Sequence, residues 1–212
     1  MSEPTKRSRL SPRWRYLPNK ADLTAMVIWL GVLLLSALQS DIAIATGSVI
    51  QTGKALPSLT ISAGGKVVLE GDDYRTAPWN GPVSLPMVQV FQYVPGTRKG
   101  GSLYDALTER MQRELDPQQF RITAIVNLDA SSVFIKPFVR AEVVDKQRTF
   151  QLATMVLDED GAGRTTWRLE QESAFIVTDE TGRVVDAIFG PPSQEDLDRI
   201  FAVLAERLLS HK

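Results

Sequence analysis

Short apolar runs bounded by turn residues predict β-strands along most of this chain. Residues 85–94 and 120–128 are apolar nearly throughout, which is typical of strands buried within a sheet. Residues 150–158 predict a third strand. A first hairpin is predicted from 59–62 and 66–71 around Ala63-Gly64-Gly65, and TAPWNGP at 76–82 is interpreted as a turn cluster. A second hairpin is predicted from 173–179 and 183–189.

Three further segments predict helices. Residues 102–115 have one apolar face and begin with Ser102, which we expect to be the N-cap residue. Residues 136–147 suit a short helix. The C-terminal helix is the clearest, because Ser193 and Asp196 form an acidic variant of the capping box. One apolar stripe follows them: Leu197, Ile200, Phe201, Leu204 and Leu208.

The order of these elements predicts an α/β fold. Strands alternate with helices and are followed by a hairpin and a last helix, which indicates a central mixed sheet covered by helices. We expect one such domain over residues 46–212.

The N-terminal 45 residues have a different character. A basic region at 1–24 precedes the uncharged apolar run 25–38, and an A-x-A sequence, Ala43-Ile44-Ala45, follows it. This pattern predicts a signal peptide over 1–45. The alternative is an uncleaved inner-membrane anchor, although 14 apolar residues are fewer than the roughly 20 that a membrane span needs. Both interpretations place the domain in the periplasm, with membrane contact only through 25–45 if the segment is uncleaved.

Composition excludes several classes of function. The 212 residues include no cysteine and one histidine, His211, so thiol redox chemistry, disulfides and thiolate metal sites are excluded. Residues 46–212 carry 18 basic and 22 acidic side chains, a net charge of −4, which predicts no nucleic-acid partner. We also expect no cofactor and no metal, since Asp158-Glu159-Asp160-Gly161 departs from the EF-hand spacing and is interpreted as a plain turn.

Several stretches resemble known families. GKALPSLTIS at 53–62 and the 173–190 hairpin are similar to segments of exported thioredoxin-like proteins. TAIVNLDA at 123–130, FVRAEV at 138–143, and above all the W-x-L-x-x-E-S stretch from Trp167 resemble the YtfJ family of exported bacterial proteins. The resemblance covers residues 47–212 and implies a thioredoxin-like fold. It implies no established activity, and the label "predicted transcriptional regulator" sometimes given to the family conflicts with the export signal.

In a thioredoxin-like fold, the reactive Cys-x-x-Cys follows the strand predicted here at 85–94. The corresponding loop contains Gly96, Thr97, Arg98 and Lys99, with Tyr104 close behind, and the position of the facing cis-proline falls at or near Ser173. Three interpretations of the loop remain open: an anion site built on Arg98 and Lys99, a protein-contact edge with Tyr93, Tyr104 and Arg98 as anchors, or a purely structural turn.

Our leading hypothesis is a non-catalytic, non-redox periplasmic protein. It would bind a protein partner or a small anionic ligand through the 95–104 loop and the facing 167–174 segment, which adds Trp167, Glu172 and Ser173 to the candidate residues. The alternative is a periplasmic enzyme that uses carboxylates among Glu170, Glu172 and Asp179.

Overall fold

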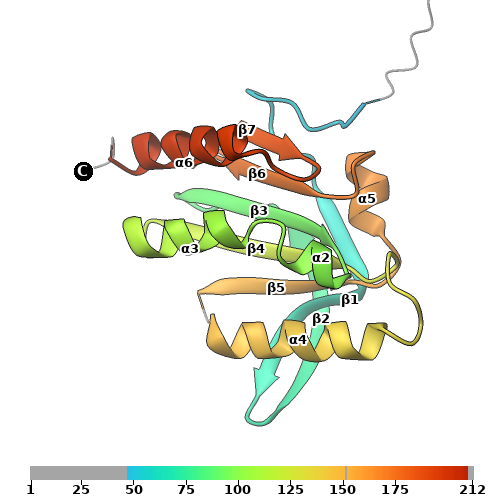
Figure 1. Ribbon diagram of the computed structural model, residues 1–212. Coiled ribbons are helices and arrows are strands. Elements are labelled where there is room, and N and C mark those ends of the chain that lie inside the picture. The colour runs from blue at the N-terminus through green and yellow to red at the C-terminus, as the bar shows by residue number, and fades with distance from the viewer. Residues whose placement is uncertain (1–46, 151, 210–212) are drawn as a thin grey trace, which may run out of the picture. The chain divides into compact units, whose positions relative to one another are not determined.

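The computed structural model describes residues 47–150 and 152–209 (Figure 1). The predicted signal peptide or anchor at 1–45 lies outside these residues. Among the described residues, no helix is both long enough and apolar enough to cross a membrane.

A seven-stranded mixed sheet forms the centre of the fold, in the order β2-β1-β5-β4-β3-β6-β7. Strands β3, β4 and β5 are parallel neighbours, and antiparallel hairpins flank them on both sides. The predicted α/β class with a mixed sheet is therefore confirmed. The strands are β1 (Leu59–Glu70), β2 (Asp73–Gly81), β3 (Val88–Pro95), β4 (Phe120–Asn127), β5 (Ala153–Asp158), β6 (Ala174–Thr178) and β7 (Val184–Phe189).

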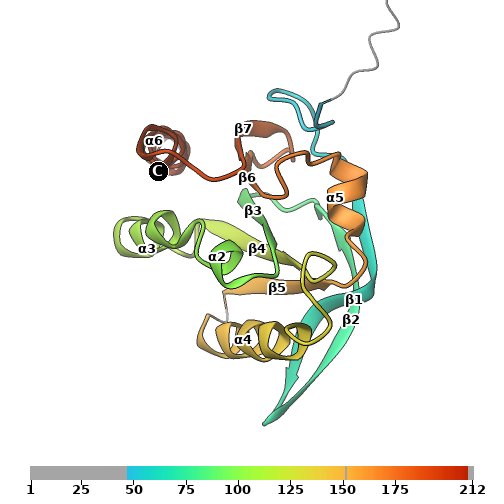
Figure 2. The same ribbon diagram turned by 45° about the vertical axis from the view of Figure 1, so that its right-hand side comes forward.

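Helices cover the two faces of this sheet unequally (Figures 1 and 2). Helices α3, α4 and α6 lie on one face, whereas the short α5 lies on the other. Helix α2 is a single turn at the end of β3. The helices are α2 (Arg98–Gly101), α3 (Asp105–Glu114), α4 (Lys136–Thr149), α5 (Ala162–Trp167) and α6 (Gln194–Leu209).

The alternation of side chains along each strand divides the interior into two cores. Val90 and Phe175 belong to a large cluster on the face covered by α3, α4 and α6. Their neighbours in sequence, Phe91 and Ile176, belong to a second cluster that includes Trp167 of α5. Both faces of the central strands are therefore buried, which is why these strands have near-continuous apolar sequences.

The predicted first hairpin is wrong. Residues 59–70 form one continuous strand that turns after Glu70, and residues 76–81, interpreted as a turn cluster, belong to its partner β2. Gly64 and Gly65 sit at a bulge with φ of +93°, and a Cβ on Gly65 would lie 2.1 Å from the Ala77 carbonyl oxygen. The glycines therefore allow close approach between strands rather than a chain reversal.

The other elements follow their predicted positions, with two differences. The C-terminal capping box is confirmed, because the Asp196 backbone N–H donates to Ser193 Oγ at 3.1 Å and the Ser193 backbone N–H donates to Asp196 Oδ2 at 3.0 Å. Helix α5 was not predicted, since AGRTTW has no apolar periodicity. The predicted helix start at Ser102 is wrong: Thr97 caps α2 instead, and α3 begins at Asp105.

Candidate functional site

Four strands bring their connecting loops to one edge of the sheet. Pro95 at the end of β3 pairs with Asn127 of β4, and Asn127 pairs with Asp158 of β5. The antiparallel β6 begins beside them, where Ala174 pairs with Tyr93. The carboxyl ends of parallel strands are where α/β proteins place their ligand sites, so this edge is the place to seek function.

Hydrogen bonds within the 95–104 loop and to the neighbouring strand β4 hold this loop in place. Thr97 Oγ1 accepts from the Gly100 backbone N–H at 3.0 Å, and the Gly96 N–H donates to the Asn127 carbonyl oxygen at 2.7 Å. Arg98 and Lys99 are exposed and form no ion pair with a described residue. Because α2 is only one turn long, its dipole adds little to their charge.

Tyr104 lies in the core rather than at the surface. Its side chain is 3% exposed, packs edge-on against Phe175 at 5.3 Å between ring centroids, and donates to the Gly190 carbonyl oxygen at 3.0 Å. Burial raises the pKa of Tyr104, and a hydrogen bond with Ser173 offsets part of this rise. Tyr104 and Ser173 are therefore brought together as expected, but in the protein interior.

The 167–174 segment is largely structural. Trp167 is fully buried, donates from its indole N–H to the Pro57 carbonyl oxygen at 2.9 Å, and packs against Tyr93. Glu172 is exposed, adopts a left-handed backbone with φ of +58°, and pairs with Arg164 at 3.3 Å. Ser173 is 2% exposed. Of the three candidate residues in this segment, only Glu172 can contact a partner.

A buried tyrosine–carboxylate pair, which sequence reasoning missed, holds this edge together. Tyr93 donates its hydroxyl to Asp158 Oδ2 at 2.8 Å, and Asp158 also accepts from the backbone N–H groups of Ala162 and Gly163, both at 2.9 Å. The Arg164 N–H donates to the Tyr93 hydroxyl oxygen at 2.9 Å. The chain bends at residues 159–160, as expected for a turn there, and Asp158 also caps the helix α5 that follows.

Both members of this pair have displaced pKa values. Burial raises the pKa of Asp158, and hydrogen bonds from Gly163, Tyr93 and Ala162 counteract this rise only in part. Burial, together with the neighbouring Asp158 carboxylate, raises the pKa of Tyr93. Neither group reaches solvent, so the pair positions the α5 segment rather than reacting with a ligand.

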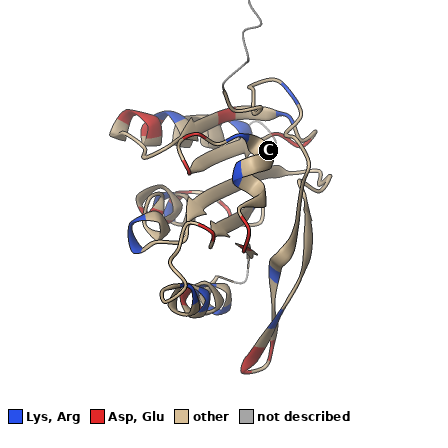
Figure 3. Ribbon diagram, turned by 90° about the vertical axis from the view of Figure 1, so that its right-hand side faces the viewer, with Lys and Arg blue, Asp and Glu red and all other residues tan. Residues whose placement is uncertain are grey.

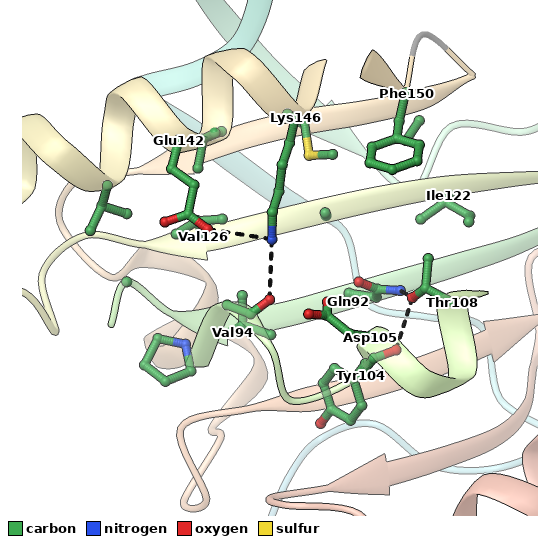
Figure 4. A pocket seen from close by; sticks show the side chains of 18 of the residues that line it. Gln92, Val94, Tyr104, Asp105, Thr108, Ile122, Val126, Glu142, Lys146 and Phe150 are labelled. Atoms are coloured by element: carbon green, nitrogen blue, oxygen red, sulfur yellow. Dashed lines mark hydrogen bonds and ion pairs between the residues drawn. The ribbon is translucent and has the colours of Figure 1, made fainter. Parts of the chain in front are cut away.

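An open hollow lies between α3 and α4, directly over the sheet (Figure 4). We call it the α3/α4 groove; its volume is about 260 Å³, and a further hollow of about 460 Å³ continues past Phe150. Its floor consists of the side chains that β3, β4 and β5 direct to this face. The apolar members are Val94, Ile122, Ala124, Val126, Ala153 and Met155, with Val139 and Val143 from α4.

Packing on either side explains why this groove stays open. Helix α3 packs toward α6, where Arg110 pairs with Asp198 at 2.8 Å and lies over the ring of Phe201 at 3.7 Å. Helix α4 instead packs against β5 and β1. The two helices therefore lie apart and leave the middle strands without full cover.

The rim of the groove carries more acidic than basic groups. Asp105 and Glu109 come from α3, and Glu142 and Lys146 from α4. Lys146 extends from α4 toward α2, with its Nζ 3.6 Å from Glu142 Oε1 and 3.3 Å from the Gly101 carbonyl oxygen (Figure 4). Three carboxylates against one ammonium favour a neutral or cationic occupant over an anion.

Three of the predicted site residues line this groove, namely Gly96, Thr97 and Tyr104. Arg98, Lys99, Trp167, Glu172 and Ser173 are not among its lining residues. The apolar floor could not be predicted from the sequence, because apolar residues at these strand positions would equally form an ordinary hydrophobic core. The signal that could have indicated it is the polar Gln92 within a largely apolar strand, since Gln92 hydrogen-bonds Thr108 at the groove (Figure 4).

Two of the three carboxylates proposed for catalysis, Glu172 and Asp179, are engaged with other groups. Glu172 is bound to Arg164. Asp179 lies in the β6–β7 turn and accepts hydrogen bonds there; burial alone would raise its pKa, but the bonds from Thr181 and Arg183 outweigh burial and lower it. Within residues 47–150 and 152–209, no three potential metal-ligating side chains come together.

Comparison with known proteins agrees with this architecture. Residues 50–207 match a family described as "Bacterial protein of unknown function (YtfJ_HI0045)". The chain is 26% identical over 160 residues to the uncharacterized protein YtfJ of Escherichia coli K12, covering 74% of this chain and 87% of that protein. A Haemophilus influenzae protein is 26% identical over 157 residues, covering 73% of this chain and 85% of the relative.

A similar solved structure shows the fold. It is described as a candidate thiol:disulfide interchange protein DsbE from Chlorobium tepidum, and it superposes with a TM-score of 0.52 at 14% identity. The match covers 75% of this chain and 99% of that one. The fold is thus thioredoxin-like, whereas this chain has no cysteine with which to perform thiol chemistry.

Proposed function

The chain belongs to the YtfJ_HI0045 family, and we propose that it is a non-redox binding protein that holds an apolar segment of a partner polypeptide in the α3/α4 groove. The observation that carries this proposal is the groove itself. It combines an apolar floor on one face of the sheet with an acidic rim, and one end of it is lined by Gly96 and Thr97, in the loop where thioredoxin-like proteins place their thiols.

The chemistry of the groove supports a polypeptide occupant. An engineered cavity of roughly 150 Å³ is large enough to hold a benzene ring, so a hollow of about 260 Å³ can accept one large apolar side chain with room beside it. The carboxylates of Asp105, Glu109 and Glu142 complement a Lys or Arg next to that side chain. An apolar anchor flanked by a cation is a common feature of peptide segments that bind in grooves.

A small anionic ligand is the less favoured occupant. Arg98 and Lys99 are the cations proposed for an anion site, yet they stand on a one-turn helix and do not line the groove. Basic and acidic positions are interspersed on the side of the molecule shown in Figure 3, so no basic stretch focuses an anion there.

We place this activity in the periplasm. The support is the sequence of residues 1–45, in which a basic region, an apolar run and an A-x-A sequence occur in the order of an export signal. A carboxylate-based enzyme remains the rival function, and turnover of any substrate that is abolished by Glu172→Gln would establish it in place of the binding role.

In-cell photo-crosslinking tests the binding role. A photoreactive amino acid replaces Thr97 or Glu109, which line the groove, and Ala141 in a control, since Ala141 is exposed on α4 but does not line the groove. We expect discrete protein adducts from both groove positions and none from Ala141.

A charge-reversal variant sharpens this test. Glu109→Lys should weaken the adduct formed at Thr97 if the partner carries a cation, whereas Glu195→Lys, at an exposed position on α6, should leave it unchanged. Adducts of equal yield from all three probe positions, or none from the groove, would show that the groove does not bind a polypeptide.

A further inference from the structure

The loop between β4 and α4, together with the first turn of α4, exposes an unusual amount of apolar surface. Four large apolar side chains within six residues face solvent: Val133 at 77%, Phe134 at 85%, Ile135 at 47% and Phe138 at 73% exposed. We call these four residues the apolar tip. Single exposed apolar residues are ordinary, but a contiguous group of this kind marks an interaction surface.

This tip is held in place by backbone hydrogen bonds. The Ser131 N–H donates to the Leu128 carbonyl oxygen at 2.9 Å, and the Ile135 N–H donates to the Ser132 carbonyl oxygen at 2.9 Å. Ser131 Oγ also donates to the Gly96 carbonyl oxygen, which fastens the loop to the end of β3. The tip is therefore presented outward and does not fold back into the groove of its own chain.

The tip and the groove occupy one side of α4. Ile135 stands four residues before Val139, and Phe138 four residues before Glu142, so each lies one turn from a residue that lines the groove. An apolar projection and an apolar hollow thus adjoin along the same helix. Such a surface can match a second copy of itself across a twofold axis, because each copy then offers one projection and receives one.

Size and charge also agree with this pairing. The groove of about 260 Å³ exceeds the roughly 150 Å³ that holds a benzene ring, so it can take the phenyl group of Phe134 or Phe138. Lys136 lies between the residues of the apolar tip and carries a positive charge. The rim of the groove carries three carboxylates, Asp105, Glu109 and Glu142, and one ammonium group, Lys146. A lipid surface suits this tip less well, because neighbouring carboxylates such as Asp129 and Glu142 disfavour approach to an anionic membrane.

We propose that the partner segment bound in the α3/α4 groove is the apolar tip of a second copy of this chain, in a reciprocal twofold dimer. This inference rests on the proposed function, because it names the polypeptide that the same groove holds. The rigid tip supplies the apolar anchor, and Lys136 supplies the cation that the acidic rim favours.

Crosslinking and mass measurement test the dimer on the full chain. A photoreactive amino acid at Phe134 should give an adduct of twice the mass of the single chain, which is 23.5 kDa if residues 1–45 are retained, mapped to groove residues of the second copy. Phe138→Ser should remove this adduct and raise the dissociation constant of the purified dimer at least roughly tenfold, as loss of an interface anchor does. Both positions are exposed, so these changes should leave folding intact.

A matched control separates the tip from exposed apolar surface in general. Val83→Ser removes a side chain that is 52% exposed outside the tip, and it should leave both the adduct and the dissociation constant unchanged. Equal effects of Phe138→Ser and Val83→Ser would overturn the proposed dimer.

The remaining outcomes distinguish the inference from the proposed function. A purified chain that sediments as a monomer at all concentrations, with groove probes that capture a different polypeptide, overturns the dimer and leaves the groove as a binding site. A Phe134 probe that captures only lipid also overturns the dimer. Groove probes that capture no polypeptide overturn both.

Discussion

The buried pair of Tyr93 and Asp158 offers a direct test of how the functional edge is stabilised. The Tyr93 hydroxyl donates to Asp158 Oδ2 at 2.8 Å and accepts from the Arg164 backbone N–H at 2.9 Å. Tyr93 and Asp158 are both fully buried. Tyr93→Phe keeps the ring and removes only the hydroxyl, so it isolates these two hydrogen bonds.

The expected cost follows from the partners that are lost. A hydrogen bond to a charged group contributes about 1.5–3 kcal/mol, and an N–H group left without an acceptor adds about 1 kcal/mol. Tyr93→Phe should therefore lower the free energy of unfolding by about 2.5–4 kcal/mol when Asp158 is ionised.

The pH dependence gives a second, sharper expectation. Burial raises the pKa of Asp158 in the folded state, because it favours the protonated carboxyl there. The stability that this raised pKa contributes is therefore present at low pH and is lost as pH rises through the folded pKa. The hydrogen bond from Tyr93 opposes this rise, since it favours the ionised carboxylate. The cost of Tyr93→Phe should therefore be largest when Asp158 is ionised and should shrink as the carboxyl becomes protonated.

Urea denaturation of the wild type and the variant from about pH 4 to pH 8 measures both expectations. Tyr74→Phe is the matched control, because Tyr74 is 40% exposed on β2, and its free energy of unfolding should match that of the wild type at every pH. A loss below roughly 0.5 kcal/mol for Tyr93→Phe, or a loss independent of pH, would refute the proposed role of the pair.

Three further substitutions test local packing. Gly163→Ala and Gly100→Ala would place a Cβ 2.3 Å from a buried tyrosine ring and 2.1 Å from a backbone carbonyl oxygen, so each should lower the unfolding midpoint, whereas Gly47→Ala, with no atom within 4 Å, should not. Ser193→Ala should cost about 1 kcal/mol by removing the cap of α6. The hydrogen bonds that Ser193 donates lower the pKa of Asp196 to about 2. The cost of Ser193→Ala should therefore be greatest at a pH above the ordinary pKa of an aspartate, and it should fall as pH drops toward 2. Equal melting curves of the wild type and the variant at pH 7 would contradict this expectation.

Sequence patterns predicted the central part of this fold because a strand buried on both faces can be recognised from its run of apolar residues. Strand β6 is buried along its whole length and is apolar from Ala174 to Val177, and the capping residues of α6 adjoin its apolar stripe. The first hairpin was misplaced because Gly64 and Gly65 look like a turn, although their function is to let Leu157 and Ala77 approach. A glycine required by a distant backbone is indistinguishable in sequence from a glycine required by a local reversal.

The site was less predictable, because its parts are ordinary residues in an unusual arrangement. The loop position of Gly96 and Thr97 followed from strand order, and both line the groove. Trp167 belonged to the most specific stretch of the resemblance, yet it is fully buried. The groove depends on the separation of α3 and α4 over the sheet, a tertiary feature that no local pattern records.

The chain lacks cysteine, and its backbone packing at this edge of the sheet also leaves no space for a second thiol. Thr97 and Gly100 have the spacing of a Cys-x-x-Cys pair at the start of a helix, and the Thr97 hydroxyl oxygen caps the Gly100 N–H. A Cβ at residue 100 would lie 2.1 Å from the Pro95 carbonyl oxygen, so the backbone has closed the space that a second thiol would need. The backbone at this helix start therefore fits a glycine at residue 100 and leaves no space for a thiol there. We accordingly expect contacts with other molecules to involve the groove and the apolar tip beside it.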